Sequence, residues 1–107
     1  MRETLGYPPA GSLMLFTVSS RSLEKTARAA ELVAGALEKA AGGHPIGVLG
    51  PTPALIERLR GRHRLQILVR GPLDDGLRLS LLRAARGSLA GMKPVDLQWD
   101  VDPIELS

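Results

Sequence analysis

The residues best suited to chemistry form a basic run in the segment ERLRGRHR, residues 57–64. Its cationic members are Arg58, Arg60, Arg62 and Arg64, with His63 beside them. Alternate side chains of an extended segment share a face, so the four arginines are expected to project together at a spacing that suits phosphate groups. The pattern predicts a cationic surface for a nucleic-acid backbone. The alternative is a solvated charged loop between two strands.

Aromatic side chains that can stack on bases are scarce, because the chain has only Tyr7, Phe16 and Trp99. Phe16 lies in an apolar run, and Tyr7 lies outside the expected sheet. Trp99 alternates with Leu97 and Val101, and this period of two favours a core position over a stacking surface. We therefore expect nucleic-acid contact to be mainly electrostatic and poor in sequence specificity.

Motifs of catalysis and nucleotide binding are missing from the sequence. Neither glycine-rich phosphate-binding pattern occurs, and no serine stands in a nucleophile motif beside His44 or His63. Asp100 and Asp102 lie two residues apart and should share a strand face, as an acid/base pair or a hard-cation site would require. Carboxylates that are solvated or bonded to an arginine are the favoured interpretation. We expect no catalytic residue, metal or cofactor in this chain.

The composition is that of an ordinary globular domain. The 107 residues suffice for one hydrophobic core, with 44% hydrophobic and 23% charged residues. The chain has no cysteine, and no apolar run approaches the roughly 20 residues that cross a bilayer. The net charge of +3 favours an anionic partner, such as a phosphate or an acidic peptide. We expect a soluble, cytoplasmic protein that does not bind membranes.

The first half of the chain predicts a strand and a helix. Residues 1–11 are expected to form an extended lead-in, and the apolar residues 12–19 a strand at a sheet centre or covered on both faces. Ser22 can cap a helix that ends at Gly42-Gly43. Its expected apolar face recurs at steps of three and four residues: Leu23, Ala27, Ala30, Ala34, Leu37 and Ala41.

The second half predicts two strands, a helix and a last strand. Residues 46–49 form a short strand closed by Gly50-Pro51, and residues 64–70 form the next strand after an irregular stretch. A helix follows Pro72, and the alternating residues 95–101 form a strand with one solvated face. The expected apolar face of this second helix is Leu77, Leu81, Ala84, Ala85 and Met92.

The resulting order is β-α-β-β-α-β with short connections. This order predicts an α+β protein, a two-layer sandwich of the ferredoxin-like plan. Residues 12–107 are expected to form this single domain.

Four segments carry a family resemblance: YPP at 7–9, VLGPTPA at 48–54, RLRGRHRLQ at 58–66 and DVDP at 100–103. Their order and spacing resemble the C-terminal domain of the primosomal protein N′ (PriA) family of bacterial replication-restart proteins. The resemblance covers nearly the whole chain. It implies a fold similar to ribosomal protein S10, which agrees with the two-layer sandwich.

The resemblance also implies a role. In this family the whole protein is an ATP-dependent 3′-5′ DNA helicase, and its ATP, magnesium and zinc bind in other domains. The C-terminal domain helps to hold single-stranded or branched DNA at a stalled fork and to dock single-stranded DNA-binding protein. The resemblance thus implies a non-catalytic DNA-binding domain of the bacterial nucleoid, monomeric when isolated. Its partners would include helicase lobes and other primosome proteins, and residues 1–11 would end a linker from a helicase lobe.

The sequence departs from the family pattern at two functional places. His63 and Leu65 stand where aromatic residues are common after the arginines. At the start of the last helix, Asp74 and Asp75 stand where some members offer basic or amide side chains to the acidic tail of single-stranded DNA-binding protein. Arg70 and Arg78 remain as candidates for that tail.

A protein-interaction module is the alternative hypothesis. The basic segment and the arginines between Arg78 and Arg86 would then receive an acidic peptide or dock onto helicase lobes, without touching DNA. DNA binding should weaken steeply with salt for any base sequence, whereas binding of a tail should also depend on its terminal carboxylate and apolar end.

Overall fold

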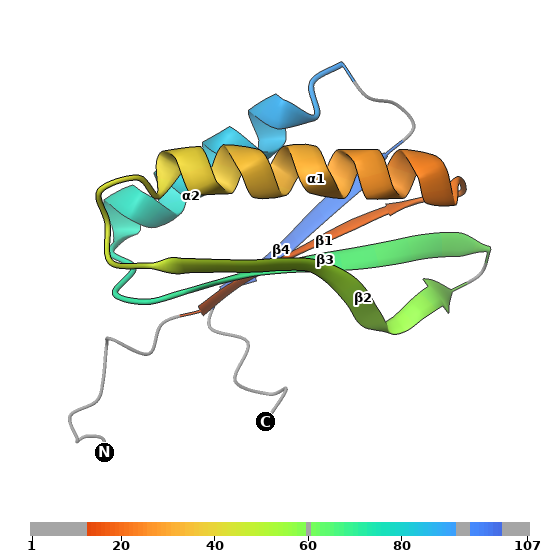
Figure 1. Ribbon diagram of the computed structural model, residues 1–107, viewed down its shortest axis with the longest axis horizontal. Coiled ribbons are helices and arrows are strands. Elements are labelled where there is room, and N and C mark those ends of the chain that lie inside the picture. Colours follow the sequence, from red (N-terminus) through yellow and green to blue (C-terminus); the bar gives the residue numbers. More distant parts are fainter. Residues whose placement is uncertain (1–12, 60, 92–94, 102–107) are drawn as a thin grey trace.

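The fold consists of four strands and two helices in the predicted order (Figure 1). The computed structural model describes residues 13–59, 61–91 and 95–101, and side chains are described outside residues 53–60. The elements are β1 (Leu13–Ser20), α1 (Leu23–Ala40), β2 (Gly47–Leu59), β3 (Arg62–Arg70), α2 (Asp75–Ser88) and β4 (Asp96–Val101). The predicted lead-in, residues 1–11, lies outside the described residues.

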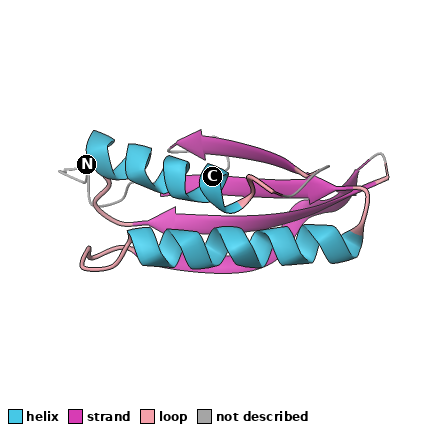
Figure 2. Cartoon of the chain, turned by 90° about the horizontal axis from the view of Figure 1, so that it is seen from above, coloured by secondary structure: helices cyan, strands magenta, loops and turns pink. Residues whose placement is uncertain are grey.

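The sheet has the strand order β2-β3-β1-β4, and every neighbouring pair is antiparallel. Both helices lie on the same side of this sheet (Figure 2). Each half of the chain contributes a strand, a helix and a second strand that does not pair with the first, which is the split-βαβ arrangement. The prediction of an α+β, ferredoxin-like two-layer sandwich is confirmed.

The core lies between the helices and one face of the sheet. On β1 it takes the even positions Met14, Phe16 and Val18, and on β3 it takes Ile67 and Val69, all of them buried. Strand residues alternate between the two faces, so one register decides which side chains enter this core. Strand β1 lies between β3 and β4, and its run of buried residues confirms the prediction of a central strand.

Helix α1 begins at the predicted cap, and most of its expected apolar face is buried. Ser22 accepts a hydrogen bond from the backbone N–H of Lys25 at 3.2 Å. The buried residues of the helix are Thr26, Ala29, Ala30, Val33, Ala34 and Leu37, and Ala41 just after it is also buried. Four of the six predicted positions are therefore confirmed: Ala30, Ala34, Leu37 and Ala41. The prediction was wrong for Leu23, which is 58% exposed, and it missed Thr26, Ala29 and Val33.

Helix α2 confirms the expected role of acids at its start. The carboxylate Oδ1 of Asp74 accepts a hydrogen bond from the backbone N–H of Leu77 at 2.7 Å, so Asp74 is the N-cap. Leu77, Leu81 and Ala85 are buried as predicted, and Met92 lies outside the described residues. In the described chain, no helix is long and apolar enough to cross a membrane.

The largest difference from the prediction lies between Gly50 and Arg64. The expected irregular stretch is instead strand: β2 continues to Leu59 and forms a hairpin with β3, with register shifts between Leu49 and Thr52 and between Pro53 and Arg58. Gly50 has φ +113°, and a Cβ there would lie 2.7 Å from the carbonyl oxygen of Gln66. A glycine therefore lets the strand bulge and continue where Gly-Pro in sequence suggests a stop.

Candidate nucleic-acid interface

The predicted basic residues lie at the closed end of the β2–β3 hairpin. Arg62, His63 and Arg64 begin β3, and the register pairs the position of Arg58 with His63. Arg60 and the side chain of Arg58 lie outside the described part of the chain. In Figure 1 this end of the hairpin lies at the same end of the molecule as the start of α1.

Two of the four arginines expected on a single face have described side chains. Arg62 and Arg64 are two residues apart on β3 and share a face, and the register places the position of Arg58 opposite His63 on the neighbouring strand. The chain reverses at Gly61, where φ is +78°, so residues 58–64 belong to two strands and not to one extended segment.

Arg62 on β3 makes hydrogen bonds to residues of both β1 and β4. Its Nη2 donates to Oδ2 of Asp96 on β4 at 2.6 Å and to the backbone carbonyl of Ser19 on β1 at 3.2 Å. Its side chain is 31% exposed and that of Asp96 is 69% exposed. An exposed pair of this kind contributes at most about 1 kcal/mol to stability, so its main consequence is to hold the guanidinium against the sheet.

Sequence reasoning missed Arg21, which the structure brings to the same end. Its neighbour Ser20 is the register partner of His63, so the exposed Arg21 follows β1 directly beside the start of β3. Arg21 and Arg62 are 41 positions apart in sequence, and only the pairing of β1 with β3 reveals their proximity. The sequence signal for Arg21 is its place directly after the first strand, which becomes useful once that strand is known to pair with β3.

Buried hydroxyl groups fix the turn that carries Arg21. Oγ of Ser20 lies 2.6 Å from Oγ1 of Thr26, and each of these oxygens lies 2.8 Å from the carbonyl oxygen of Ser22. Ser20 and Thr26 are fully buried. Because a buried hydroxyl without a partner would be costly, this network holds the β1–α1 turn in one conformation. We call Arg21, Arg62, His63 and Arg64 the hairpin-end cluster.

The two arginines expected to receive an acidic tail lie at the opposite end of the sheet. Arg70 ends β3 and is exposed, and Arg78 lies in α2, where its Nη1 donates to Oδ1 of Asp75 at 3.3 Å. Asp74 caps the helix beside them. Asp74 and Asp75 thus place two carboxylates near Arg70 and Arg78.

The remaining sequence candidates fall on β4. Asp100 is exposed, and Asp102 lies outside the described residues. Trp99 was expected in the core, yet it is 39% exposed, because β4 is an edge strand and the ring lies at the margin of the helix layer. The Arg86 guanidinium carbon lies 6.0 Å from the centre of that ring. Among the described residues, no group of three or more potential ligands suits a metal ion.

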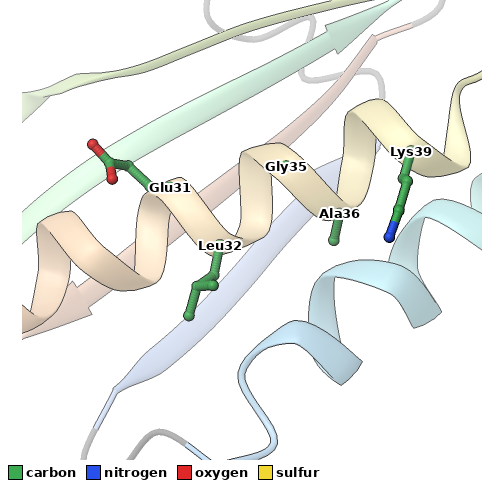
Figure 3. A pocket seen from close by; sticks show the side chains of 5 residues that line it. All are labelled: Glu31, Leu32, Gly35, Ala36 and Lys39. Carbon is green, nitrogen blue, oxygen red and sulfur yellow. The ribbon is translucent and has the colours of Figure 1, made fainter.

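A hollow of about 440 Å³ lies along the outer side of α1 (Figure 3). It is lined by Glu31, Leu32, Gly35, Ala36 and Lys39. Figure 3 shows Lys39 pointing towards α2 and Glu31 pointing away from it. One acid and one base separated by two helical turns offer no catalytic pairing, so the basic hairpin end remains the better candidate site.

The fold and the hairpin-end cluster define a small α+β domain of the ferredoxin-like plan with arginines gathered at one end. Residues 3–104 match the family model described as Primosomal protein N C-terminal domain, and the chain belongs to this family. This confirms the resemblance noted in the sequence.

Curated relatives agree with this assignment. The chain is 37% identical over 109 residues to "Replication restart protein PriA" of Synechocystis sp., covering 98% of this chain and 12% of that protein. It is 32% identical over 107 residues to the protein of the same name from Treponema pallidum, covering 98% of this chain and 16% of that protein. The chain thus spans less than a fifth of the length of these relatives.

Solved structures support the fold alone. The "De novo designed protein Foldit4" superposes with a TM-score of 0.63 at 13% identity, covering 85% of this chain and 94% of that one. A hydantoinase/carbamoylase family amidase from Burkholderia ambifaria gives a TM-score of 0.56 at 16% identity, covering 86% of this chain and 27% of that one. A designed protein and part of an amidase share this layout, so the layout by itself does not define an activity.

Proposed function

We propose that this chain is a non-catalytic DNA-binding domain of a replication-restart protein, and that the hairpin-end cluster contacts the DNA backbone. The observation that carries the proposal is the gathering of Arg21, Arg62 and Arg64 at one end of the sheet by the β1–β3 register. Arg62 is paired there with Asp96. Arginines gathered in this way attract phosphates of any sequence.

The family gives this contact its context. Relatives bear the name replication restart protein, so we propose that the parent protein acts on stalled forks as a helicase and that ATP, magnesium and zinc belong to its other domains. The domain would then help to hold single-stranded or branched DNA while helicase lobes and other primosome proteins act on it, in the bacterial nucleoid.

The chemistry of the cluster favours backbone contact over base recognition. The hairpin-end cluster contains three arginines and one histidine, and none of its members is a phenylalanine, tyrosine or tryptophan, the larger rings for base stacking. Nη2 of Arg62 donates to Ser19 and Asp96, so a phosphate would bind the other N–H groups of the guanidinium and compete with Asp96 for its charge. We expect little discrimination among base sequences.

The test is a fluorescence-anisotropy titration of labelled single-stranded and forked DNA with the chain at several salt concentrations. A variant with Arg60, Arg62 and Arg64 changed to Ala is compared with a control in which Lys39, Arg70 and Arg83, all exposed and away from the hairpin end, become Ala. Both variants lose three positive charges. Equal loss of binding in the two variants, or no binding by the parent at low salt, contradicts the proposal.

Docking of single-stranded DNA-binding protein is the second candidate, at Arg70 and Arg78. The exposed, basic Arg70 favours an acidic peptide there, whereas Asp74 and Asp75 oppose one. Titration with an acidic peptide that ends in an apolar residue, beside the same peptide with an amidated terminus, tests this site. Equal affinity for both peptides would show charge attraction without recognition of the terminal carboxylate.

A further inference from the structure

The two edges of the sheet differ in their capacity to pair with another strand. On edge strand β2, the register shifts twice against β3, and Pro51 and Pro53 lack a backbone N–H donor. Prolines and bulges are devices by which sheet edges avoid further pairing. On edge strand β4, six residues run in unbroken register with β1, without proline or glycine. In the part of the chain that the structure describes, no strand pairs with the outer edge of β4.

Strand β4 has a different character on each face. Trp99 and Val101 lie on the helix side, opposite Phe16 and Met14, and are 39% and 45% exposed. Asp96 and Asp100 lie on the helix-free side, opposite Ser19 and Leu15. Asp96 is paired with Arg62, and Asp100 is exposed and makes no ion pair among the described residues. The edge therefore offers apolar surface on one face and negative charge on the other.

We propose that the outer edge of β4 binds an extended peptide strand of a partner protein whose side chains alternate between apolar and basic. Its backbone would continue the hydrogen-bonded ladder of the sheet. Its apolar side chains would pack beside Trp99 and Val101, and a basic side chain would face Asp100, since directly opposed residues of neighbouring strands lie about 5 Å apart. The contacts with Trp99, Asp100 and Val101 lie beyond the hairpin-end cluster, which meets β4 only through the pairing of Arg62 with Asp96 among the described contacts.

Charge decides between this occupant and two others. Pairing of two copies through β4 would gather Asp96 and Asp100 of both chains on one face, and like charges on opposed strands are destabilising. Single-stranded DNA could stack on Trp99 beside Arg86, but a strand of nucleic acid along the edge would also carry its phosphates past the exposed Asp100 on the other face of β4. A strand with basic residues converts the same carboxylate into an attractive contact.

Trp99 makes the proposal directly measurable, because it is the only tryptophan in the chain. The probe is a blocked hexapeptide of alternating valine and lysine, titrated into the 107-residue chain. We expect a change in Trp99 emission, and NMR shifts and slowed amide exchange confined to β4. A fully N-methylated version of the peptide keeps the side chains but cannot donate hydrogen bonds to the ladder. Its affinity for the chain should be lower by at least about tenfold.

A charge-reversal pair tests the polarity of the site. Asp100→Lys should weaken binding of the valine-lysine peptide about fivefold and strengthen binding of a valine-glutamate peptide. Glu31→Lys makes the same charge change at an exposed position on α1 and should leave both affinities within about twofold. Circular dichroism checks that both variants fold.

Several outcomes would overturn the proposal. Sedimentation that shows a dimer in the absence of peptide would assign the edge to a second copy. Quenching of Trp99 by oligothymidylate without any response to the peptide would assign Trp99 to nucleic acid. Equal affinity for the N-methylated peptide, or no response to the valine-lysine peptide, would remove strand pairing altogether.

Discussion

The two ends of β3 carry arginines in opposite electrostatic surroundings. At the hairpin end, Arg62 and Arg64 are joined by Arg21, with Asp96 as the nearby acid. At the other end, Arg70 and Arg78 stand beside Asp74 and Asp75. The nine residues of β3 separate these ends by roughly 26 Å, more than two Debye lengths at physiological salt.

The number of arginines alone therefore does not identify an anion-binding site, because neighbouring carboxylates also set the local charge. Each end has arginines and an ion pair, Arg62 with Asp96 at one end and Arg78 with Asp75 at the other, and the second end also holds the carboxylate of Asp74. Charges more than a Debye length apart are largely screened, so each end is governed by its own balance.

Removing the basic side chains of the hairpin end should have the largest effect. With Arg60, Arg62 and Arg64 changed to Ala, affinity for single-stranded DNA should fall about five-hundredfold at about 50 mM salt, because each of the three lost phosphate contacts costs about eightfold there. The slope of log affinity against log salt should also become shallower by about 0.7 per lost contact. Anisotropy titrations at several salt concentrations measure both. A slope that is unchanged would mean that these arginines do not contact phosphates.

Gly50→Ala should destabilise the β2–β3 hairpin that carries the basic residues. The new Cβ would lie 2.7 Å from the carbonyl oxygen of Gln66 at a φ of +113°, so the free energy of unfolding should fall by about 2 kcal/mol. Gly35→Ala is the matched control: it has open space and lies within α1, so it should stabilise by about 0.5 kcal/mol. Urea denaturation compares the two. Equal midpoints would show that the bulge at Gly50 is not constrained by β3.

Asp96→Asn should sharpen the contrast between the ends. It removes the carboxylate that holds Arg62, so affinity for single-stranded DNA should rise about threefold, while stability falls by less than about 1 kcal/mol. Asp75→Asn removes an acid from the opposite end and should leave DNA affinity nearly unchanged. Anisotropy and urea denaturation give the two readouts. Weaker DNA binding by Asp96→Asn would mean that the ion pair orients Arg62 for the phosphate.

Arg70→Ala should have the smallest effect on DNA. Because Arg70 lies at the far end of β3, affinity for a short single-stranded oligonucleotide should change by less than about twofold at physiological salt. The same variant should weaken binding of an acidic peptide if that end receives one. Parallel anisotropy titrations with the two labelled ligands measure this. A larger loss for DNA than for the peptide would reverse the assignment of the two ends.

The sequence by itself determined the order of elements and the fold class. Alternation in β4, the Ser22 cap, and the spacing of Leu77, Leu81 and Ala85 are local signals, and they predicted elements that the structure confirms. Local signals suffice because caps and periodicity are decided within one or two turns of chain. The basic segment and the family resemblance were also visible in the sequence.

Tertiary structure decided which residues share a surface. The sequence showed an interruption at Gly50-Pro51, and only pairing with β3 shows that β2 continues past it. The sequence placed Arg58 with Arg62 and Arg64, and the hairpin register separates its position from theirs and brings Arg21 to the same end of the sheet. Trp99 looked like a core residue by alternation, and its exposure followed from the place of β4 at the edge of the sheet. Strand pairing joins residues far apart in sequence, and no local pattern records which strand becomes an edge.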